Sequence, residues 1–313
     1  MTGVSTPAQT LAVLTSGGDA PGMNMAVHVL TERAETAGWR VLGVREGFQG
    51  LLHADFVTLQ TPETGRRTRL GGSFLGCSRL PEFSSFIPRF SEIFTEHGIT
   101  HLAVIGGNGS FRAAAQLSSL LPVAGLPGTI DNDVTGSELS IGFDTALNTG
   151  LSLLDGMRDS AESLPRMFAL ETLGGDTGFL AHAVATAGGA DLVLLPEQVL
   201  SEAEVCERLR AGVLRHRYAL VVASEGYPDL EGVLARASKT LEARIRVSRI
   251  GHAQRGGRPS AGDRLLAHAL ATAAFSMLQA NRSGAALWRA GRAVALPFAE
   301  VEPDKPFAAW GSA

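Results

Sequence analysis

Two glycine-rich segments of the sequence could bind phosphate groups. They span residues 15–24 (TSGGDAPGMN) and 106–110 (GGNGS), and each follows an apolar run and leads into a segment with helical spacing. Glycine lets backbone N–H groups approach a polyanion, and a helix N-terminus adds a favourable dipole. Neither segment matches GxxxxGK[ST] or GxGxxG, and each is also explained as a tight turn, with Ser110 as a helix N-cap in the second. If both loops lie at one edge of a sheet, their backbone N–H groups could bind successive phosphates of one polyphosphate.

Two carboxylates and a hydroxyl follow the next apolar run, in residues 127–133 (PGTIDND). If this segment is extended, Thr129, Asp131 and Asp133 point to the same side, because side chains alternate along a strand. One carboxylate could then accept a proton from an attacking alcohol while the other helps to position a cation or a water molecule. An Asx-rich turn is the alternative interpretation of the same residues.

Basic side chains that could bind phosphate are scattered along the chain: Arg79, Arg166, Arg246, and His252 and Arg255 in the run GHAQRGG at 251–257. Arginine binds phosphate through a planar fork of donors, although each of these residues could instead form a surface ion pair. Glu225 follows another apolar run and could accept hydrogen bonds from sugar hydroxyls or cap a turn.

Continuous apolar runs alternate with segments of helical period along the chain. The runs are residues 11–16, 40–44, 101–107, 121–130, 191–197, 218–225 and 243–251, and the helical segments are 26–38, 111–121, 145–160, 202–216 and 261–278. Apolar runs without alternation are typical of parallel strands that helices cover on both faces. The pattern predicts an α/β fold with doubly wound, mostly parallel sheets, whose ligand sites lie at the carboxyl ends of the strands.

Length and composition predict an ordinary globular protein. The 313 residues favour two domains or one large one, with a boundary near 140–145, and residues 297–313 are expected to be irregular.

The formal net charge of −4 gives no basic field for nucleic acid or anionic lipid. Two cysteines, Cys77 and Cys206, are too few for a disulfide framework, and no segment has the pattern of a signal peptide or a membrane span. We therefore expect a cytoplasmic protein without nucleic-acid or membrane partners.

Taken together, these motifs resemble the bacterial ATP-dependent 6-phosphofructokinase family. The matching segments are LTSGGDAPGMN (14–24), GGNGS (106–110), LPGTIDND (126–133), IGFDTAL (141–147), Arg166 and GHAQRGG (251–257), in the order of the family. The resemblance extends from about Leu11 to Leu278. It implies two Rossmann-like α/β domains, one of residues 1–141 plus about 255–300 for the nucleotide, and one of residues 142–254 plus about 301–313 for the sugar phosphate.

The resemblance also implies an activity, the transfer of a phosphoryl group from MgATP to the 1-hydroxyl of D-fructose 6-phosphate in glycolysis. The nucleotide would contact Gly18, Arg79, Leu80, Gly107, Asn108, Gly109 and Ser110, with Phe48 near the adenine, and Asn108 would face the Mg²⁺. Asp131 would accept the proton of the hydroxyl, helped by Thr129 and Asp133. Small residues at Gly109 and Gly128 favour ATP over pyrophosphate as the donor.

The sugar phosphate would be held by residues of two subunits. Within one subunit the resemblance implies Thr129, Asp131, Leu173, Gly174, Gly175, Glu225, His252 and Arg255. Arg166 and Arg246 would reach across from a neighbouring subunit, which implies a homo-oligomer, typically a homotetramer.

Three departures from the family pattern bear on activity and control. Asn108 stands where the family has Asp, and Gly175 stands where it has Arg, so a charge near the metal and a charge near the transferred group are both missing. At the effector site, Arg158 and Asp191 match the family, but His28 and Glu32 replace basic residues, so we expect weakened or altered allosteric control by ADP and phosphoenolpyruvate. Two alternatives stay open: a family member using pyrophosphate or another sugar phosphate, and a catalytically weakened paralogue that only binds ligands.

Overall fold

The computed structural model describes residues 9–301, 305 and 307 of the chain. It divides into two compact units, which are described separately. Of the described residues, unit 1 contains 9–129, 133–142, 257–301 and 305, and unit 2 contains 130–132, 143–256 and 307. Of residues 301–313, which were expected in the second domain, Val301 and Lys305 belong to unit 1, Phe307 belongs to unit 2, and the others lie outside the described residues.

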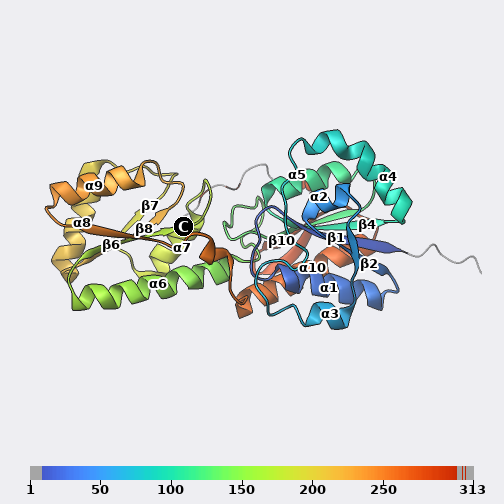
Figure 1. Ribbon diagram of the computed structural model, residues 1–313, viewed down its shortest axis with the longest axis horizontal. Helices are drawn as coiled ribbons and strands as arrows, with labels where there is room; N and C mark the ends of the chain where they lie inside the picture. The colour runs from blue at the N-terminus through green and yellow to red at the C-terminus, as the bar shows by residue number, and fades with distance from the viewer. Residues whose placement is uncertain (1–8, 302–304, 306, 308–313) are drawn as a thin grey trace, which may run out of the picture. The chain divides into compact units, whose positions relative to one another are not determined.

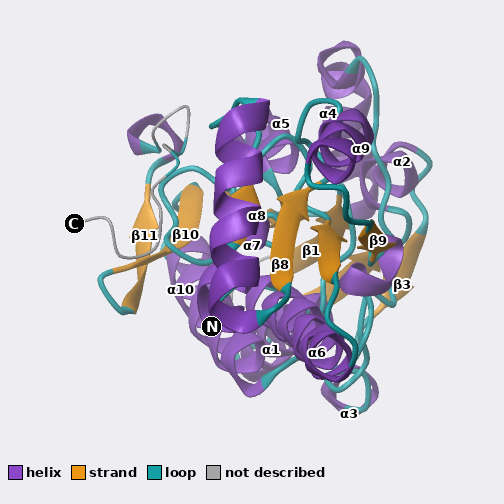
Figure 2. Ribbon diagram, turned by 90° about the vertical axis from the view of Figure 1, so that its left-hand side faces the viewer, coloured by secondary structure: helices purple, strands orange, loops and turns teal. Residues whose placement is uncertain are grey.

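Unit 1 contains a seven-stranded sheet in the order β11-β10-β5-β4-β1-β2-β3. Its strands are β1 (Thr10–Ser16), β2 (Arg40–Val44), β3 (Phe56–Thr58), β4 (His101–Gly106), β5 (Val123–Pro127), β10 (Gly284–Arg289) and β11 (Arg292–Leu296). The inner strands β10, β5, β4, β1 and β2 are parallel, whereas β3 and β11 pair antiparallel at the two edges. The β10–β11 hairpin is clear in Figure 2.

Helices cover both faces of this sheet. The helices of unit 1 are α1 (Met23–Thr36), α2 (Gly47–Leu52), α3 (Thr61–Gly65), α4 (Ile87–His97), α5 (Asn108–Leu117) and α10 (Ala261–Gln279), with short 3₁₀ turns at Phe83–Phe86 and Phe298–Glu300. Figure 1 shows α1, α3 and α10 on one face and α2, α4 and α5 on the other. Because both faces are covered, β1, β4 and β5 are buried along their whole length.

Unit 2 contains a four-stranded, wholly parallel sheet in the order β7-β8-β6-β9. Its elements are β6 (Met167–Thr172), β7 (Leu192–Leu194), β8 (Ala219–Ser224), β9 (Ile245–Arg249), α6 (Phe143–Ser163), α7 (Phe179–Gly188), α8 (Glu202–His216), α9 (Leu230–Thr240) and a 3₁₀ turn at Gly251–Arg255. Helices α6 and α7 lie on one face of the sheet, and α8 and α9 on the other (Figure 1). A capping box between Ser201 and Glu204 begins α8.

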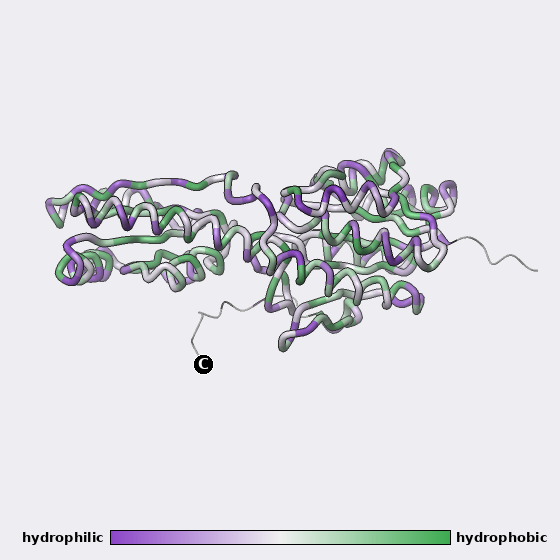
Figure 3. Tube along the Cα trace, turned by 90° about the horizontal axis from the view of Figure 1, so that it is seen from below, coloured by the Kyte–Doolittle hydropathy of each residue, from purple (hydrophilic) through white to green (hydrophobic). Residues whose placement is uncertain are grey.

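The expected α/β class with mostly parallel sheets is confirmed. Every apolar run named above overlaps a strand, and every segment of helical period overlaps a helix. Strand β6 and the β10–β11 hairpin were not predicted, because MFALET and GAALWR contain only one β-branched residue between them, Thr172. Figure 3 shows hydrophobic and hydrophilic stretches alternating along the helices, as expected for helices with one face against a sheet. Within the described residues, no helix is long and apolar enough to cross a membrane.

Candidate functional site

The two glycine loops of unit 1 lie side by side, as the sequence predicted. Strands β1 and β4 are neighbours, with Ser16 paired to Gly106, so both loops leave the same edge of the sheet. A Cβ on Gly106 would lie 2.4 Å from the Ser110 hydroxyl oxygen and 2.5 Å from the Ser16 carbonyl oxygen, so only glycine fits there. Helix α5 begins at Asn108 and its N-cap is Gly107, so the alternative of Ser110 as the N-cap is wrong. The first-turn N–H groups of α5 therefore point out of the sheet edge and can bind an anion.

A third segment, residues 76–80, runs beside these loops. The backbone N–H of Gly17 donates to the Ser78 carbonyl oxygen at 3.1 Å, and the Ser16 hydroxyl donates to the same oxygen at 3.3 Å. This contact places Arg79, whose side chain is exposed, next to the first loop. Phe48 is buried in the core, 3% exposed, with its ring 4.9 Å from that of Phe83, so it leaves little surface for a ligand.

Asn108 is held by a hydrogen-bond network with the segment that follows β5. Its Nδ2 donates to the carbonyl oxygen of Asp133 at 3.0 Å and to the Asp133 carboxylate at 3.1 Å. Its Oδ1 accepts from the N–H and the hydroxyl of Thr135, at 3.2 and 3.3 Å. Burial raises the pKa of Asp133, although hydrogen bonds from its own backbone and from Asn108 and the charges of Lys305 and Arg112 act in the opposite direction.

This network bears on how a Mg²⁺ ion would be held. Both ends of the Asn108 amide are already hydrogen-bonded, which leaves the Asp133 carboxylate as the stronger ligand of the two. No group of three or more His, Cys, Asp or Glu side chains able to hold a metal occurs among residues 9–301, 305 and 307. Such a sparse set fits Mg²⁺, which usually binds through one or two carboxylates, waters and the phosphates of its substrate.

Residues 129–133 are not extended, so the expectation that Thr129, Asp131 and Asp133 alternate along a strand is wrong. Strand β5 ends at Pro127, a turn follows, and Asn132 adopts a left-handed conformation with φ 55°. Asparagine tolerates this conformation better than most residues, which is why the chain can reverse there. Thr129 is buried in unit 1 beside Gly107, whereas Asp131 belongs to unit 2.

In unit 2, Asp131 lies near a turn that follows β6. A Cβ on Gly175 would lie 3.8 Å from the Asp131 carboxylate and, among the described residues, would meet no other atom within 4 Å. The Glu225 carboxylate holds this turn, because its Oε1 accepts from the N–H groups of Gly174 at 3.2 Å and of Gly175 at 2.9 Å. Glu225 therefore caps a turn, and within the described residues no donor contacts its other oxygen.

Gln254 is a positioning residue that the sequence analysis missed. Its side chain is fully buried, accepts from the Leu173 N–H at 2.9 Å and donates to the Ala146 carbonyl oxygen at 3.1 Å. It thus joins the turn after β6 to helix α6. The residue was present in GHAQRGG, between an alanine and an arginine, and an amide that is buried there needs hydrogen-bond partners of its own.

The remaining basic candidates lie at opposite ends of the sheet of unit 2. His252 and Arg255 follow the carboxyl end of β9, next to the ends of β6 and β8 that carry Gly175 and Glu225. Arg166 precedes β6 and Arg246 is near the start of β9, so both lie at the amino end. A six-residue strand is about 20 Å long, so these two groups do not meet within one unit 2.

The two effector candidates of unit 2 have structural contacts. A guanidinium nitrogen of Arg158 donates to the Gly188 carbonyl oxygen at the end of α7. Asp191 is nearly buried, accepts from the Leu220 N–H at 2.9 Å and lies 3.4 Å from Arg215. In unit 1, Nδ1 of His28 lies 3.0 Å from the Thr64 hydroxyl oxygen.

Comparisons with known proteins show what the chain is similar to. Residues 10–278 match the family model described as Phosphofructokinase. A protein of Listeria welshimeri named ATP-dependent 6-phosphofructokinase is 39% identical over 300 residues, or 94% of each chain. Its Thermus thermophilus counterpart, ATP-dependent 6-phosphofructokinase 1, is 40% identical over 281 residues, or 88% of this chain and 87% of that one.

Solved structures show the same fold. Phosphofructokinase of Pichia pastoris matches with a TM-score of 0.89 at 25% identity, over 95% of this chain, which spans 38% of that longer chain. A pyrophosphate-dependent phosphofructokinase from Marinobacter aquaeolei matches with a TM-score of 0.85 at 23% identity, over 94% of this chain and 83% of the other.

Proposed function

Because this chain belongs to the phosphofructokinase family, we propose that it transfers the γ-phosphoryl group of ATP to the 1-hydroxyl of fructose 6-phosphate. One observation carries the proposal: the neighbouring strands β1, β4 and β5 of unit 1 end in the two glycine loops and in PGTIDND. A polyphosphate bound to the loops would thus lie next to the end of β5. The segment after β5 carries the Thr129 hydroxyl and the Asp131 and Asp133 carboxylates. The products are ADP and fructose 1,6-bisphosphate.

Unit 1 binds the nucleotide. The N–H groups of Gly18 and of residues 107–110 receive the phosphates, and Arg79 and Leu80 line the same edge. The Asp133 carboxylate, with the phosphates, would hold a Mg²⁺ ion, which would neutralise the negative charge that develops during transfer. Backbone N–H groups that already point at the phosphates do not have to move during the reaction, so they stabilise the transition state.

Unit 2 binds the sugar and supplies the base. Asp131 accepts the proton of the attacking hydroxyl, and Thr129 helps to orient it. His252 and Arg255 donate hydrogen bonds to fructose 6-phosphate, Oε2 of Glu225 accepts from a sugar hydroxyl, and the turn of residues 173–175 contacts the sugar. Gln254 and Glu225 keep that turn in place through their hydrogen bonds to its N–H groups.

The sugar site is completed by a second subunit. Arg166 and Arg246 lie at the end of the sheet opposite to Glu225, so the same sugar phosphate contacts both sets only if the arginines come from a neighbouring chain. We therefore propose a homo-oligomer, a homotetramer by resemblance. A cytoplasmic location fits the two free cysteines and the glycolytic reaction.

The test is Asp131→Ala, with Asp176→Ala as the control. Asp176 is an exposed carboxylate in the same turn as Gly175, so its removal changes charge without touching the base. Loss of a general base lowers turnover by about 10²–10⁴-fold. We expect this loss in Asp131→Ala with fructose 6-phosphate binding retained, as judged by thermal shift. Full turnover in Asp131→Ala would refute the assignment.

Pyrophosphate is the second candidate donor, since one structural neighbour is named pyrophosphate-dependent. The named relatives of higher identity are ATP-dependent, and Gly109 leaves room in the loop, because a Cβ there meets only Arg112 at 3.9 Å. Gly128 is small for a packing reason, since a Cβ there would lie 2.8 Å from Ile105. Assays with ATP or pyrophosphate as sole donor separate the two enzymes. Ligand binding without turnover under either donor would indicate a weakened paralogue.

Allosteric control is expected to be weak. Arg158 donates to the Gly188 carbonyl oxygen, Arg215 lies beside the Asp191 carboxylate, and His28 is in contact with Thr64, so the described residues of this site offer an anionic effector little uncompensated positive charge. A shift of fructose 6-phosphate half-saturation by ADP or phosphoenolpyruvate as strong as in typical relatives would contradict this.

A further inference from the structure

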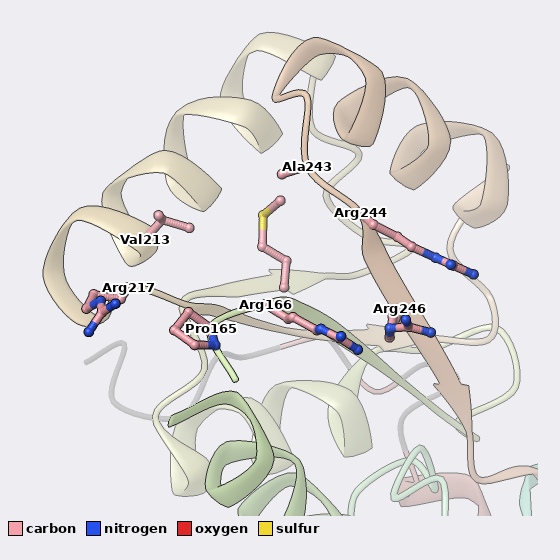
Figure 4. A pocket seen from close by; sticks show the side chains of 8 residues that line it. Pro165, Arg166, Val213, Arg217, Ala243, Arg244 and Arg246 are labelled. Atoms are coloured by element: carbon pink, nitrogen blue, oxygen red, sulfur yellow. The ribbon is translucent and has the colours of Figure 1, made fainter. Parts of the chain in front are cut away.

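Two cations of unit 1, Arg112 of α5 and Lys305 of the C-terminal segment, lie near the Asp133 carboxylate. They are distinct from the basic pocket at the amino end of the unit 2 sheet, which is part of the proposed sugar-phosphate site. Figure 4 shows that pocket of about 320 Å³ and the arginines that line it, Arg166, Arg217, Arg244 and Arg246. The pair in unit 1 lies instead beside the loops that receive the nucleotide.

Arg112 reaches back over the first turn of α5. It is the fifth residue of this helix, yet a nitrogen of its guanidinium would lie 3.9 Å from a Cβ on Gly109, the second residue. Asn108, Arg112 and Thr135 line one hollow of about 210 Å³, and the Arg112 side chain is exposed, so the guanidinium is open to a ligand. Across the described part of the chain, no carboxylate lies within ion-pair distance of Arg112.

Lys305 comes to the same region from the C-terminal end of the chain. Its Nζ donates to the Glu138 carbonyl oxygen at 3.4 Å, and it lies close enough to Asp133 for the two charges to interact. Burial lowers the pKa of Lys305 to about 8, while the charges of Asp133 and Glu138 act in the opposite direction. The ammonium group is therefore still protonated in most molecules at neutral pH, and an anion beside it offsets the cost of its burial.

The start of α5 is more positive than the start of a helix usually is. A capping side chain or an acidic residue in the first turn commonly stabilises this end, because the N–H groups and the helix dipole are positive there. In α5 the N-cap is Gly107, and among the described residues no side chain caps the helix and no acidic residue lies in its first turn. Arg112 and Lys305 add two positive charges, of which the Asp133 carboxylate balances one. A bound anion would complete the charge balance.

A metal ion in this site would not replace the two cations. A Mg²⁺ ion held by the Asp133 carboxylate has a net charge of about +1, whereas a terminal phosphate group alone carries about −2 at neutral pH. The phosphates of a nucleotide therefore keep negative charge for a guanidinium and an ammonium. The guanidinium can bind two phosphate oxygens at once, and the ammonium acts as a point charge.

We propose that Arg112 and Lys305 bind the β- and γ-phosphate groups of the nucleotide and so give unit 1 its preference for a triphosphate over a monophosphate. The proposal rests on the proposed function, in which the phosphates lie at the start of α5. It adds two residues that the sequence analysis did not identify, and it makes the C-terminal segment part of the nucleotide site.

The test is calorimetric titration of the full chain with ATP and with AMP, in EDTA so that no metal ion contributes. Arg112→Gln and Lys305→Gln should each weaken ATP binding about 10-fold or more, because each removes a charge-assisted hydrogen bond to a phosphate. AMP has only the phosphate next to the ribose, so its affinity should change little in both variants. Arg112→Lys, which keeps the charge but not the planar fork, should lie between Arg112→Gln and the original chain.

Arg282→Gln is the matched control. Arg282 is an exposed arginine of unit 1 that precedes β10, and β10 is parallel to β5, so Arg282 lies at the end of the sheet opposite to the glycine loops. This variant should bind ATP like the original chain. Unchanged ATP affinity in Arg112→Gln or in Lys305→Gln would overturn the proposal, and so would an equal loss for AMP or an equal loss in Arg282→Gln.

The titration requires neither the sugar nor turnover, so it separates this proposal from the proposed function. ATP binding that depends on Arg112 and Lys305, in a chain that transfers no phosphoryl group, would refute only the kinase assignment. Turnover that depends on Asp131, with ATP affinity unaffected in Arg112→Gln and Lys305→Gln, would refute only the present proposal.

Discussion

Replacing Asn108 by aspartate tests the hydrogen-bond network at the start of α5. The Asn108 amide nitrogen lies 3.1 Å from the Asp133 carboxylate, so Asn108→Asp turns a hydrogen bond into the contact of two negative charges. Two unit charges 4 Å apart interact by about 4 kcal/mol at an effective dielectric constant of about 20. Because both side chains are only half-buried and can rotate apart, we expect about 2 kcal/mol of lost stability. At about 2–4 °C per kcal/mol, the melting temperature falls by about 4–8 °C.

The same substitution creates a pair of hard oxygen ligands. We therefore expect millimolar Mg²⁺ to restore the melting temperature of Asn108→Asp, while it changes that of the original chain little in the absence of nucleotide. Thermal melting in EDTA and in Mg²⁺ measures both effects. Gln279→Glu, which adds a charge at an exposed position of unit 1, is the control. If Asn108→Asp melts like the original chain in EDTA and does not respond to Mg²⁺, the contact between positions 108 and 133 is not as described.

Two further predictions follow from the turn after β6 and from a buried histidine. Gly175→Arg should raise turnover by up to ~10²-fold over Gly175→Ala. The Cβ of a residue at this position lies 3.8 Å from the Asp131 carboxylate, so the arginine places a cation near the transferred group. Equal turnover rates in the two variants would contradict this. Burial lowers the pKa of His101, so below about pH 6.5 the unfolded chain binds a proton that the folded chain does not. The free energy of unfolding, measured with urea, should therefore fall as the pH drops below about 6.5, and His101→Gln should show a smaller slope; identical slopes would refute the role of His101.

Much of the fold could be predicted from local pattern. A strand covered on both faces must be apolar along its length, so β1, β4 and β8 were visible as continuous runs. Helix α7 was not predicted, because FLAHAVATAG is apolar almost all round and has no clear period. The turn at Asn132 was offered only as the alternative to an extended segment, since a left-handed residue interrupts a strand pattern without changing its composition.

The sequence by itself determined the chemistry of the loops, because glycine, carboxylate and arginine identities and their order along the chain are independent of tertiary packing. Which of these groups meet was decided only by the tertiary structure. The pairing of β6 with β9 gathers Arg166, Arg244 and Arg246 from positions about 80 residues apart, and Gln254 reaches Leu173 across the same distance. Such contacts depend on strand order and register, which local residue patterns do not encode.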